Sequence, residues 1–211
     1  MTVTDVFKQI IDGSIIEGWV KDTLVDWWEV YSRELEVQRG ETPGRHPLPA
    51  SFQVIDGPSP DREAADQLPS IVVISPGLNG QRPVHDGRGV YRATWMVGIG
   101  MFVSAGTRED TKDLVRFYAA VARAIMLQKG RMGRDEVART TWLDESYDDD
   151  FSFVDQQTIS AGSVIFEVEV DNVTTHGAGP VADPDPGTQP GSQPHHANRV
   201  IIDLRKERIV E

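Results

Sequence analysis

The segment 90–104 constrains the fold more than any other part of this sequence, which reads VYRATWMVGIGMFVS there. Its odd-numbered positions from Tyr91 to Val103 are all apolar, whereas its even-numbered positions include Arg92, Thr94 and Ser104. A period of two places alternate side chains on opposite faces of a strand. We therefore predict a strand with one buried face, around which the rest of the chain is organised.

This predicted strand is unusually long. At about 3.3 Å per residue it would extend over roughly 50 Å, beyond the usual three to ten residues of a strand. Gly98 and Gly100 lie within it, and glycine inside a strand often marks a bulge, a bend or a close backbone approach. The strand either bends at these glycines or extends out of its own domain, where it needs a partner. Gly98 and Gly100 are therefore candidate positions for folding and subunit contact.

The N-terminal 40 residues predict two helices. Residues 2–12 have the spacing of a short helix with Thr4 as its N-cap. Ser14 and Glu17 then match a capping box, which opens a longer helix. This helix carries an apolar stripe at intervals of three and four, which packs on the chain's own sheet or on a neighbouring subunit: Ile16, Val20, Leu24, Trp27 and Tyr31.

Further elements follow along the chain. Residues 51–56 and 71–74 are strand candidates, and so are residues 151–154 and 163–173. Thr107 and Asp110 form a second capping-box pattern, which opens a helix that ends near Gly130. The apolar face of this helix is predicted to comprise Leu114, Phe117, Val121 and Ile125.

Two groups of charged residues are candidates for contact with partners. Arg82, His85 and Arg88 lie in residues 77–89, a projecting loop or small hairpin with two turn signals. They are either solvated or paired with an acidic surface of a neighbour. On the strand 163–173, a row of carboxylates lies opposite the apolar positions. This row is either an ordinary hydrated face or the lining of a ring that repels passing DNA: Glu167, Glu169 and Asp171.

Composition excludes several classes of protein. The 211 residues carry a formal charge of −12, which opposes gripping nucleic acid or an anionic membrane. There is no cysteine, so disulfides and thiolate metal sites are absent. The chain has no signal-like N-terminus and no stretch of eighteen apolar residues, so we expect a soluble protein made in the cytoplasm.

No motif in the sequence identifies an enzyme. The phosphate loop, HExxH, GxSxG and strand-to-helix GxGxxG patterns are all missing. The acidic cluster in residues 144–150 has neither the spacing nor the glycine of an EF-hand, so we interpret it as a solvated loop rather than a cation site. His46, His85 and the pair His195–His196 are interpreted as loop residues without partners. We predict no catalytic residue, no metal site and no cofactor.

The C-terminal residues 174–211 differ in composition from the rest. They are rich in glycine, proline and polar residues and cannot form a core of their own. We expect an extended arm that lies against its own subunit or a neighbour. A short apolar run within it is a candidate for pairing with a sheet edge: Val200, Ile201 and Ile202.

The order of these elements resembles a known family over residues 4–173. The segments that carry the resemblance are LPSIVVISPGLNGQRPVHDGRGVYRATWMVGIGMFVSA, DLVRFYAAVARAIML, TTWLDESYDDDFSF and AGSVIFEVEVDNV. They are similar to the tail terminator proteins of long, noncontractile-tailed (siphovirus-type) phages of actinobacterial hosts. The resemblance implies a mixed β-sheet flanked by helices and a homohexameric ring in the virion neck.

The predicted fold class is therefore α+β. It comprises a mixed, mostly antiparallel sheet flanked by helices, with N-terminal helices over residues 1–40, a core over 41–173 and an extended arm over 174–211. By resemblance, the ring ends tail-tube polymerisation and joins the major tail tube protein to a head-side connector or stopper protein, while DNA passes through without specific binding. Two alternatives are a head-completion or stopper protein of the same neck, and a metal-dependent cytoplasmic enzyme.

Overall fold

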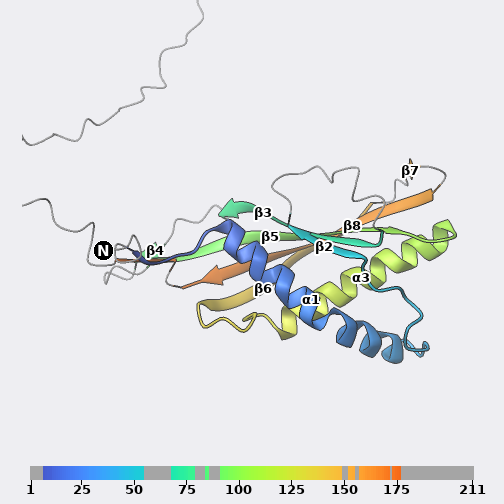
Figure 1. Ribbon diagram of the computed structural model, residues 1–211, viewed down its shortest axis with the longest axis horizontal. Coiled ribbons are helices and arrows are strands. Elements are labelled where there is room, and N and C mark those ends of the chain that lie inside the picture. Colours follow the sequence, from blue (N-terminus) through green and yellow to red (C-terminus); the bar gives the residue numbers. More distant parts are fainter. Residues whose placement is uncertain are drawn as a thin grey trace, which may run out of the picture.

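A computed structural model describes residues 7–54, 68–78, 84–85, 91–148, 152–154, 157–171 and 173–176. Its main sheet has the strand order β2 (Ser51–Val54), β3 (Ser70–Leu78), β5 (Tyr91–Ser104), β8 (Gln157–Val170) and β6 (Val137–Tyr147). Only β2 and β3 are parallel, and the other pairs are antiparallel. Helices α1 (Gly13–Gln38) and α3 (Arg108–Gln128) lie together on one face of the sheet (Figure 1). The α+β prediction is confirmed.

Strand β5 is the centre of the sheet, as its sequence predicts. It pairs with β3 on one side and with the equally long β8 on the other. The register with β8 runs without interruption from Ala93, opposite Val170, to Ser104, opposite Ile159. The odd-numbered side chains are buried against the helices from Ala93 to Val103. The length of β5 is therefore accommodated within its own sheet.

The glycines of β5 do not form a bulge. Gly98 and Gly100 keep a regular register, and a β-carbon at either would approach its nearest neighbour no closer than 3.8 Å. The irregularity lies instead in β3, between Ile74 and Gly77. There the backbone N–H of Ser75 donates to the carboxylate of Glu17 on α1 at 2.5 Å. The bulge is therefore stabilised by a helix side chain.

Helix α1 begins two residues earlier than the predicted capping box. Its N-cap is Asp12, whose carboxylate accepts the backbone N–H of Ile15 at 3.0 Å and the hydroxyl of Ser14 at 2.7 Å. Glu17 does not return to Ser14, because it reaches β3. The helix ends at Gln38. Gly40 lies just beyond the C-cap with φ at +73°, and its N–H donates to the carbonyl of Val37, so the chain leaves the helix through a glycine.

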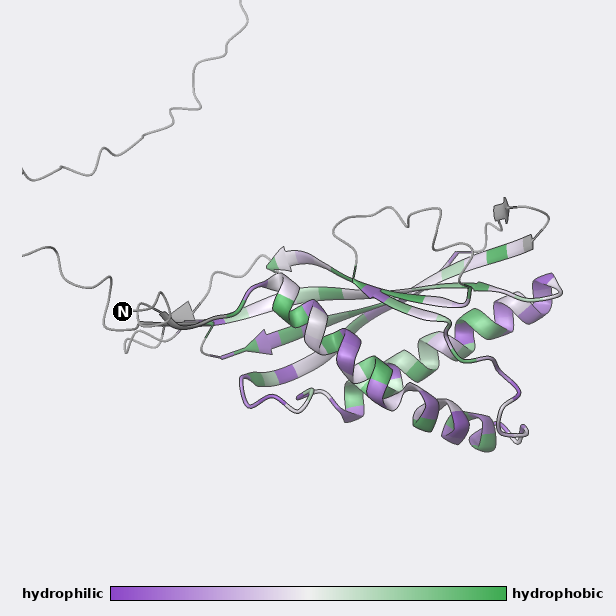
Figure 2. Cartoon of the chain, viewed as in Figure 1, coloured by the Kyte–Doolittle hydropathy of each residue, from purple (hydrophilic) through white to green (hydrophobic). Residues whose placement is uncertain are grey.

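The apolar stripe of α1 packs on its own subunit. Ile16, Val20 and Leu24 are buried against the sheet and α3, as predicted for packing within the chain. Further along, the buried position is Trp28, whose ring contacts Phe52 and Tyr118, while Trp27 is 36% exposed. Figure 2 shows that α1 and the strands both carry bands of hydrophobic and hydrophilic residues.

Helix α3 matches its prediction closely. The hydroxyl of Thr107 accepts the N–H of Asp110 at 3.1 Å and donates to its carboxylate at 2.7 Å. All four residues of the predicted apolar face are buried: Leu114, Phe117, Val121 and Ile125. Local signals are sufficient here because both the cap and the stripe lie within one helix.

Two predictions about secondary structure were wrong. The predicted helix at residues 2–12 is replaced, within the described part, by strand β1 (Phe7–Ile10), which pairs with β9 (Thr174–His176). That partner lies far away in the sequence, so the local helical spacing gave no sign of it. Residues 144–147, predicted as part of a solvated loop, belong to the edge strand β6, whose two register irregularities obscure its alternation.

Candidate functional site

The face of the sheet opposite α1 and α3 carries most of the predicted site residues that the structure describes. No helix of the described part covers this face (Figure 1). The even-numbered positions of β5, which include Gly98 and Gly100, lie on this face, and all but Arg92 are half-buried. The predicted carboxylate row of β8 shares this face, because Val164, Phe166, Val168 and Val170 fill the opposite one.

Two carboxylates of the row, Glu169 and Asp171, are paired with arginines. Arg92 on β5 donates through two nitrogens to Asp171, and its third nitrogen lies 2.8 Å from Glu169. Arg139 on β6 lies 3.3 Å from the other oxygen of Glu169. The hydrogen bonds with Asp171 raise the pKa of Arg92 above its ordinary value. Three carboxylates therefore share their face with two guanidinium groups, which the sequence pattern of β8 alone did not reveal.

Of the remaining predicted contact residues, only His85 lies within the described residues. His85 belongs to the short strand β4 (Val84–His85), whose backbone pairs with the first residues of β5. This pairing confirms the hairpin form predicted for the loop. Further candidates lie outside the described residues: Arg82, Arg88, Val200, Ile201 and Ile202.

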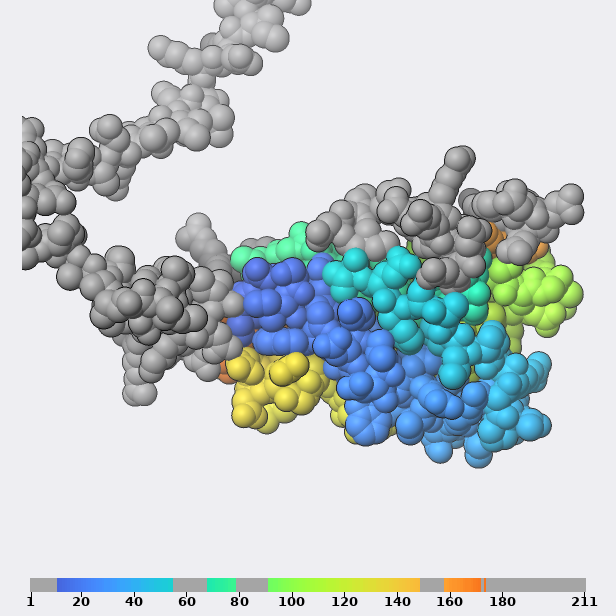
Figure 3. Space-filling model, in the orientation of Figure 1, coloured from blue at the N-terminus to red at the C-terminus, as the bar shows by residue number. Residues whose placement is uncertain are grey.

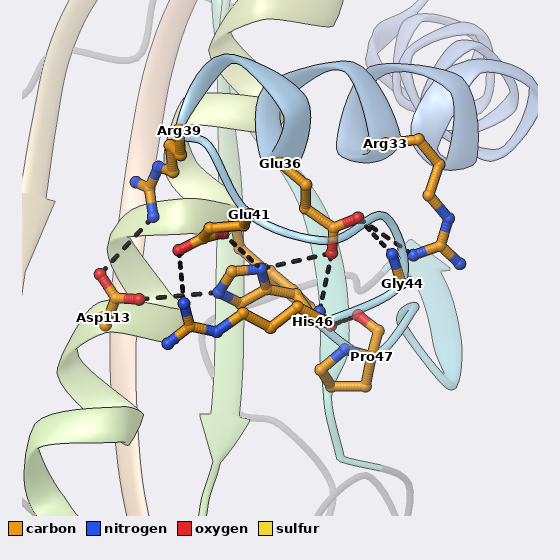
Figure 4. A network of polar contacts seen from close by, with 10 residues as sticks. Arg33, Glu36, Arg39, Glu41, Gly44, His46, Pro47 and Asp113 are labelled. Carbon is orange, nitrogen blue, oxygen red and sulfur yellow. Dashed lines mark hydrogen bonds and ion pairs between the residues drawn. The ribbon is translucent and has the colours of Figure 1, made fainter.

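A buried polar network surrounds His46, so the prediction that this is a loop residue without partners is wrong. His46 is 6% exposed, and its ring stacks on Phe117 of α3 with centroids 3.9 Å apart. Its Nδ1 lies 3.4 Å from Glu36 and 3.5 Å from Glu41, and its Nε2 lies 3.6 Å from Asp113 (Figure 4). The network joins the end of α1, the following connector and the start of α3.

Glu36 is the most enclosed member of this network. Its side chain is fully buried and accepts the backbone N–H of Gly44 at 2.6 Å and that of His46 at 2.7 Å (Figure 4). Burial alone would raise the pKa of Glu36, but these hydrogen bonds and Arg33 outweigh it, so the pKa lies below the ordinary value of 4.5. Glu36 therefore holds the connector in place as a charged carboxylate.

The chemistry of the network favours a structural role. Glu41, His46 and Asp113 place one potential ligand atom each within 4.8 Å of one another, and these atom types can bind a divalent cation. Each carboxylate of the network already has an arginine partner, however: Glu36 with Arg33, Glu41 with Arg45, and Asp113 with Arg39. These guanidinium groups supply the positive charge that a metal would bring.

The acidic cluster at residues 144–150 is only partly described. Glu145 is held by Arg123 of α3 and by the hydroxyl of Tyr147, so it belongs to the packing between β6 and α3. Asp144 and Asp148 are exposed, and residues 149–150 lie outside the described part. The prediction of a solvated loop is therefore wrong for residues 144–147, which are part of a strand.

Comparison with known proteins gives no further identification. No family model matches this sequence, and no curated protein matches it either. Among the described residues, no helix is both long and apolar enough to cross a membrane.

Proposed function

We propose that this chain is a structural virion protein, a tail terminator that forms a ring at the head-proximal end of a phage tail. The proposal starts from the resemblance of residues 4–173 to that family. In this role the ring stops polymerisation of the tail tube and joins the major tail tube protein to a head-side connector or stopper protein. DNA passes through the ring without specific binding, in keeping with the net charge of −12.

The observation that carries the proposal is that the described helices, α1 and α3, cover only one face of the sheet. Both described helices pack on the same face, and no helix of the described residues lies over the other face, which five strands present. Half-buried Met96, Phe102 and Ile165 lie there beside the glycines of β5. A sheet face that is partly apolar and charge-compensated is suited to contact with protein. It is less suited to the strong repulsion of DNA that a bare row of carboxylates would give.

Light scattering after size-exclusion chromatography, together with native mass spectrometry, tests the proposal. A hexamer of 23.4 kDa subunits has a mass of 6 × 23.4, about 140 kDa. We expect a discrete closed assembly of this order, visible as rings by negative-stain electron microscopy. A stable 23.4 kDa monomer across the accessible concentration range would contradict the proposal.

A further inference from the structure

A groove lies where the end of α3 meets the start of β6 beside α1. It has a volume of about 630 Å³, and α1, the last turn of α3, the turn at residues 129–133 and the first part of β6 all contribute to it. Figure 3 shows α1, in blue, directly beside the yellow segment that contains this turn. The exposed apolar surface in the groove comes from Trp27 and Leu127, which are 36% and 50% exposed.

The groove is positively charged in an acidic protein. Lys129 and Arg131 supply its positive charge, and Asp26 is the single carboxylate among the lining residues. Arg139 also lines the groove, but its guanidinium is paired with Glu169. The ammonium of Lys129 lies 3.6 Å from the ring centroid of Trp27, so apolar and cationic surfaces are combined at one place. The groove therefore favours an occupant that is both acidic and aromatic.

The turn that borders the groove is fixed by hydrogen bonds. The N–H of Met132 donates to the carbonyl of Lys129 at 2.6 Å, and the hydroxyl of Thr140 donates to the carbonyl of Gly130 at 2.6 Å. Met132 and Gly133 both have positive φ angles, of 52° and 65°. A turn held in this way needs little rearrangement on binding.

The opposite end of β6 has the complementary chemistry. Asp144 and Asp148 are exposed there, and Tyr147 between them is 38% exposed. Trp142 and Leu143, 43% and 45% exposed, continue this apolar surface along the strand. β6 is an edge strand of the described sheet, so this surface is accessible from the side.

One subunit cannot bring these two ends together by itself. Residues 139 and 148 are nine positions apart, which at about 3.3 Å per residue separates them by roughly 30 Å along β6. Each copy therefore carries one basic groove and one acidic strand end at separate places on its surface. Repetition of such a head-to-tail contact gives a ring when the rotation closes.

We propose that the groove lined by Lys129 and Arg131 binds the acidic, aromatic end of β6, around Asp144, Tyr147 and Asp148, from a second copy of this chain. The inference rests on the proposed ring and goes beyond it by naming the two surfaces in contact. Charge complementarity sets the register of the contact, and the apolar side chains along β6 supply buried area.

Charge reversal of each surface tests this contact. The groove variant carries Lys129→Glu and Arg131→Glu, and the strand-end variant carries Asp144→Lys and Asp148→Lys. Each variant alone should fail to assemble and should have the mass of a monomer by light scattering.

An equimolar mixture of the two variants should recover the wild-type mass, because the acidic groove of one variant accepts the basic strand end of the other. A chain with all four changes should also assemble. The matched control is Glu34→Lys, an exposed reversal on α1 that should assemble like the wild type.

The outcomes separate this inference from the proposed function. If the wild type assembles and both reversal variants assemble equally well, the contact is wrong while the ring stands. Folded variants that stay monomeric in the mixture also overturn the contact. A monomeric wild type overturns the ring and this contact with it.

Circular dichroism shows whether each variant is folded. Should a reversal variant unfold, Arg131→Gln and Asp144→Asn replace it, and each should weaken subunit association at least several-fold. Unchanged association in both would refute the contact.

Discussion

Removing the carboxylate of Glu36 should destabilise the protein more than any change at an exposed position of α1. In Glu36→Ala, the backbone N–H groups of Gly44 and His46 lose their acceptor, and His46 also loses one of its flanking carboxylates. A buried donor left without a partner costs about 1–3 kcal/mol. His46 is buried, so its N–H should account for about 2 kcal/mol, whereas Gly44 is exposed and its N–H should account for less. We therefore expect the free energy of unfolding to fall by about 2–3 kcal/mol.

Urea denaturation followed by tryptophan fluorescence measures this loss. The midpoint should fall while the slope with urea stays the same, since the exposed area on unfolding hardly changes. Glu36→Gln keeps one carbonyl oxygen as acceptor and should lose about half as much. Glu34→Ala, an exposed substitution on the same helix, should change stability by less than about 0.5 kcal/mol.

The pH dependence gives an independent check on this reasoning. The pKa of Glu36 is lowered in the folded protein, so its contribution is fully present above the unfolded value of 4.5 and is lost as the pH falls through the folded pKa. The difference between the wild type and Glu36→Ala should therefore shrink in acid. A difference below about 1 kcal/mol at pH 7, or one that stays constant into strong acid, would refute the role assigned to Glu36.

Further predictions concern packing, capping and ionisation. Gly98→Ala should leave the melting temperature unchanged or raise it, because the new β-carbon would have no neighbour closer than 3.8 Å. Gly162→Ala should lower the melting temperature, because its β-carbon would lie 2.9 Å from a valine methyl of α3. Thr107→Ala should cost about 1 kcal/mol in a urea titration through loss of the helix cap. In an alkaline absorbance titration Tyr147 should ionise only at high pH, since burial and Glu145 raise its pKa to about 12. Burial also raises the pKa of Tyr118, which should not ionise before the protein unfolds.

The sequence predicts the elements whose signals are local. The alternation of residues 91–103 identified β5 and its buried face, and the pattern from Thr107 to Ile125 identified α3 with its cap. In both cases burial follows directly from spacing within one element. Parts of the fold with this property could be predicted without knowledge of their partners.

The predictions that failed depend on residues that are distant in sequence. Residues 7–10 became a strand because β9 pairs with them, and tertiary pairing overrides weak helical spacing. The spacing of Glu17 matches a capping box, but its carboxylate instead accepts the backbone N–H of Ser75, which the bulge in β3 leaves without a partner in the sheet.

The candidate site was only partly predictable for the same reason. The carboxylates of β8 were expected on one face, but their partners Arg92 and Arg139 come from the two neighbouring strands, so the compensation of charge depends on strand order. His46 is enclosed by groups from α1, the connector and α3. No pattern around His46 in the sequence indicates that enclosure.

The most direct test of the proposed role is the growth of tail tubes in its presence. Purified tail tube protein from the same phage would be polymerised with and without this chain, and tube lengths and ends would be recorded by electron microscopy. A terminator should arrest elongation at substoichiometric amounts and appear as a ring on one end of each tube. Tubes that grow to the same length with bare ends would contradict the terminator role, and binding to the connector alone would favour a stopper protein instead.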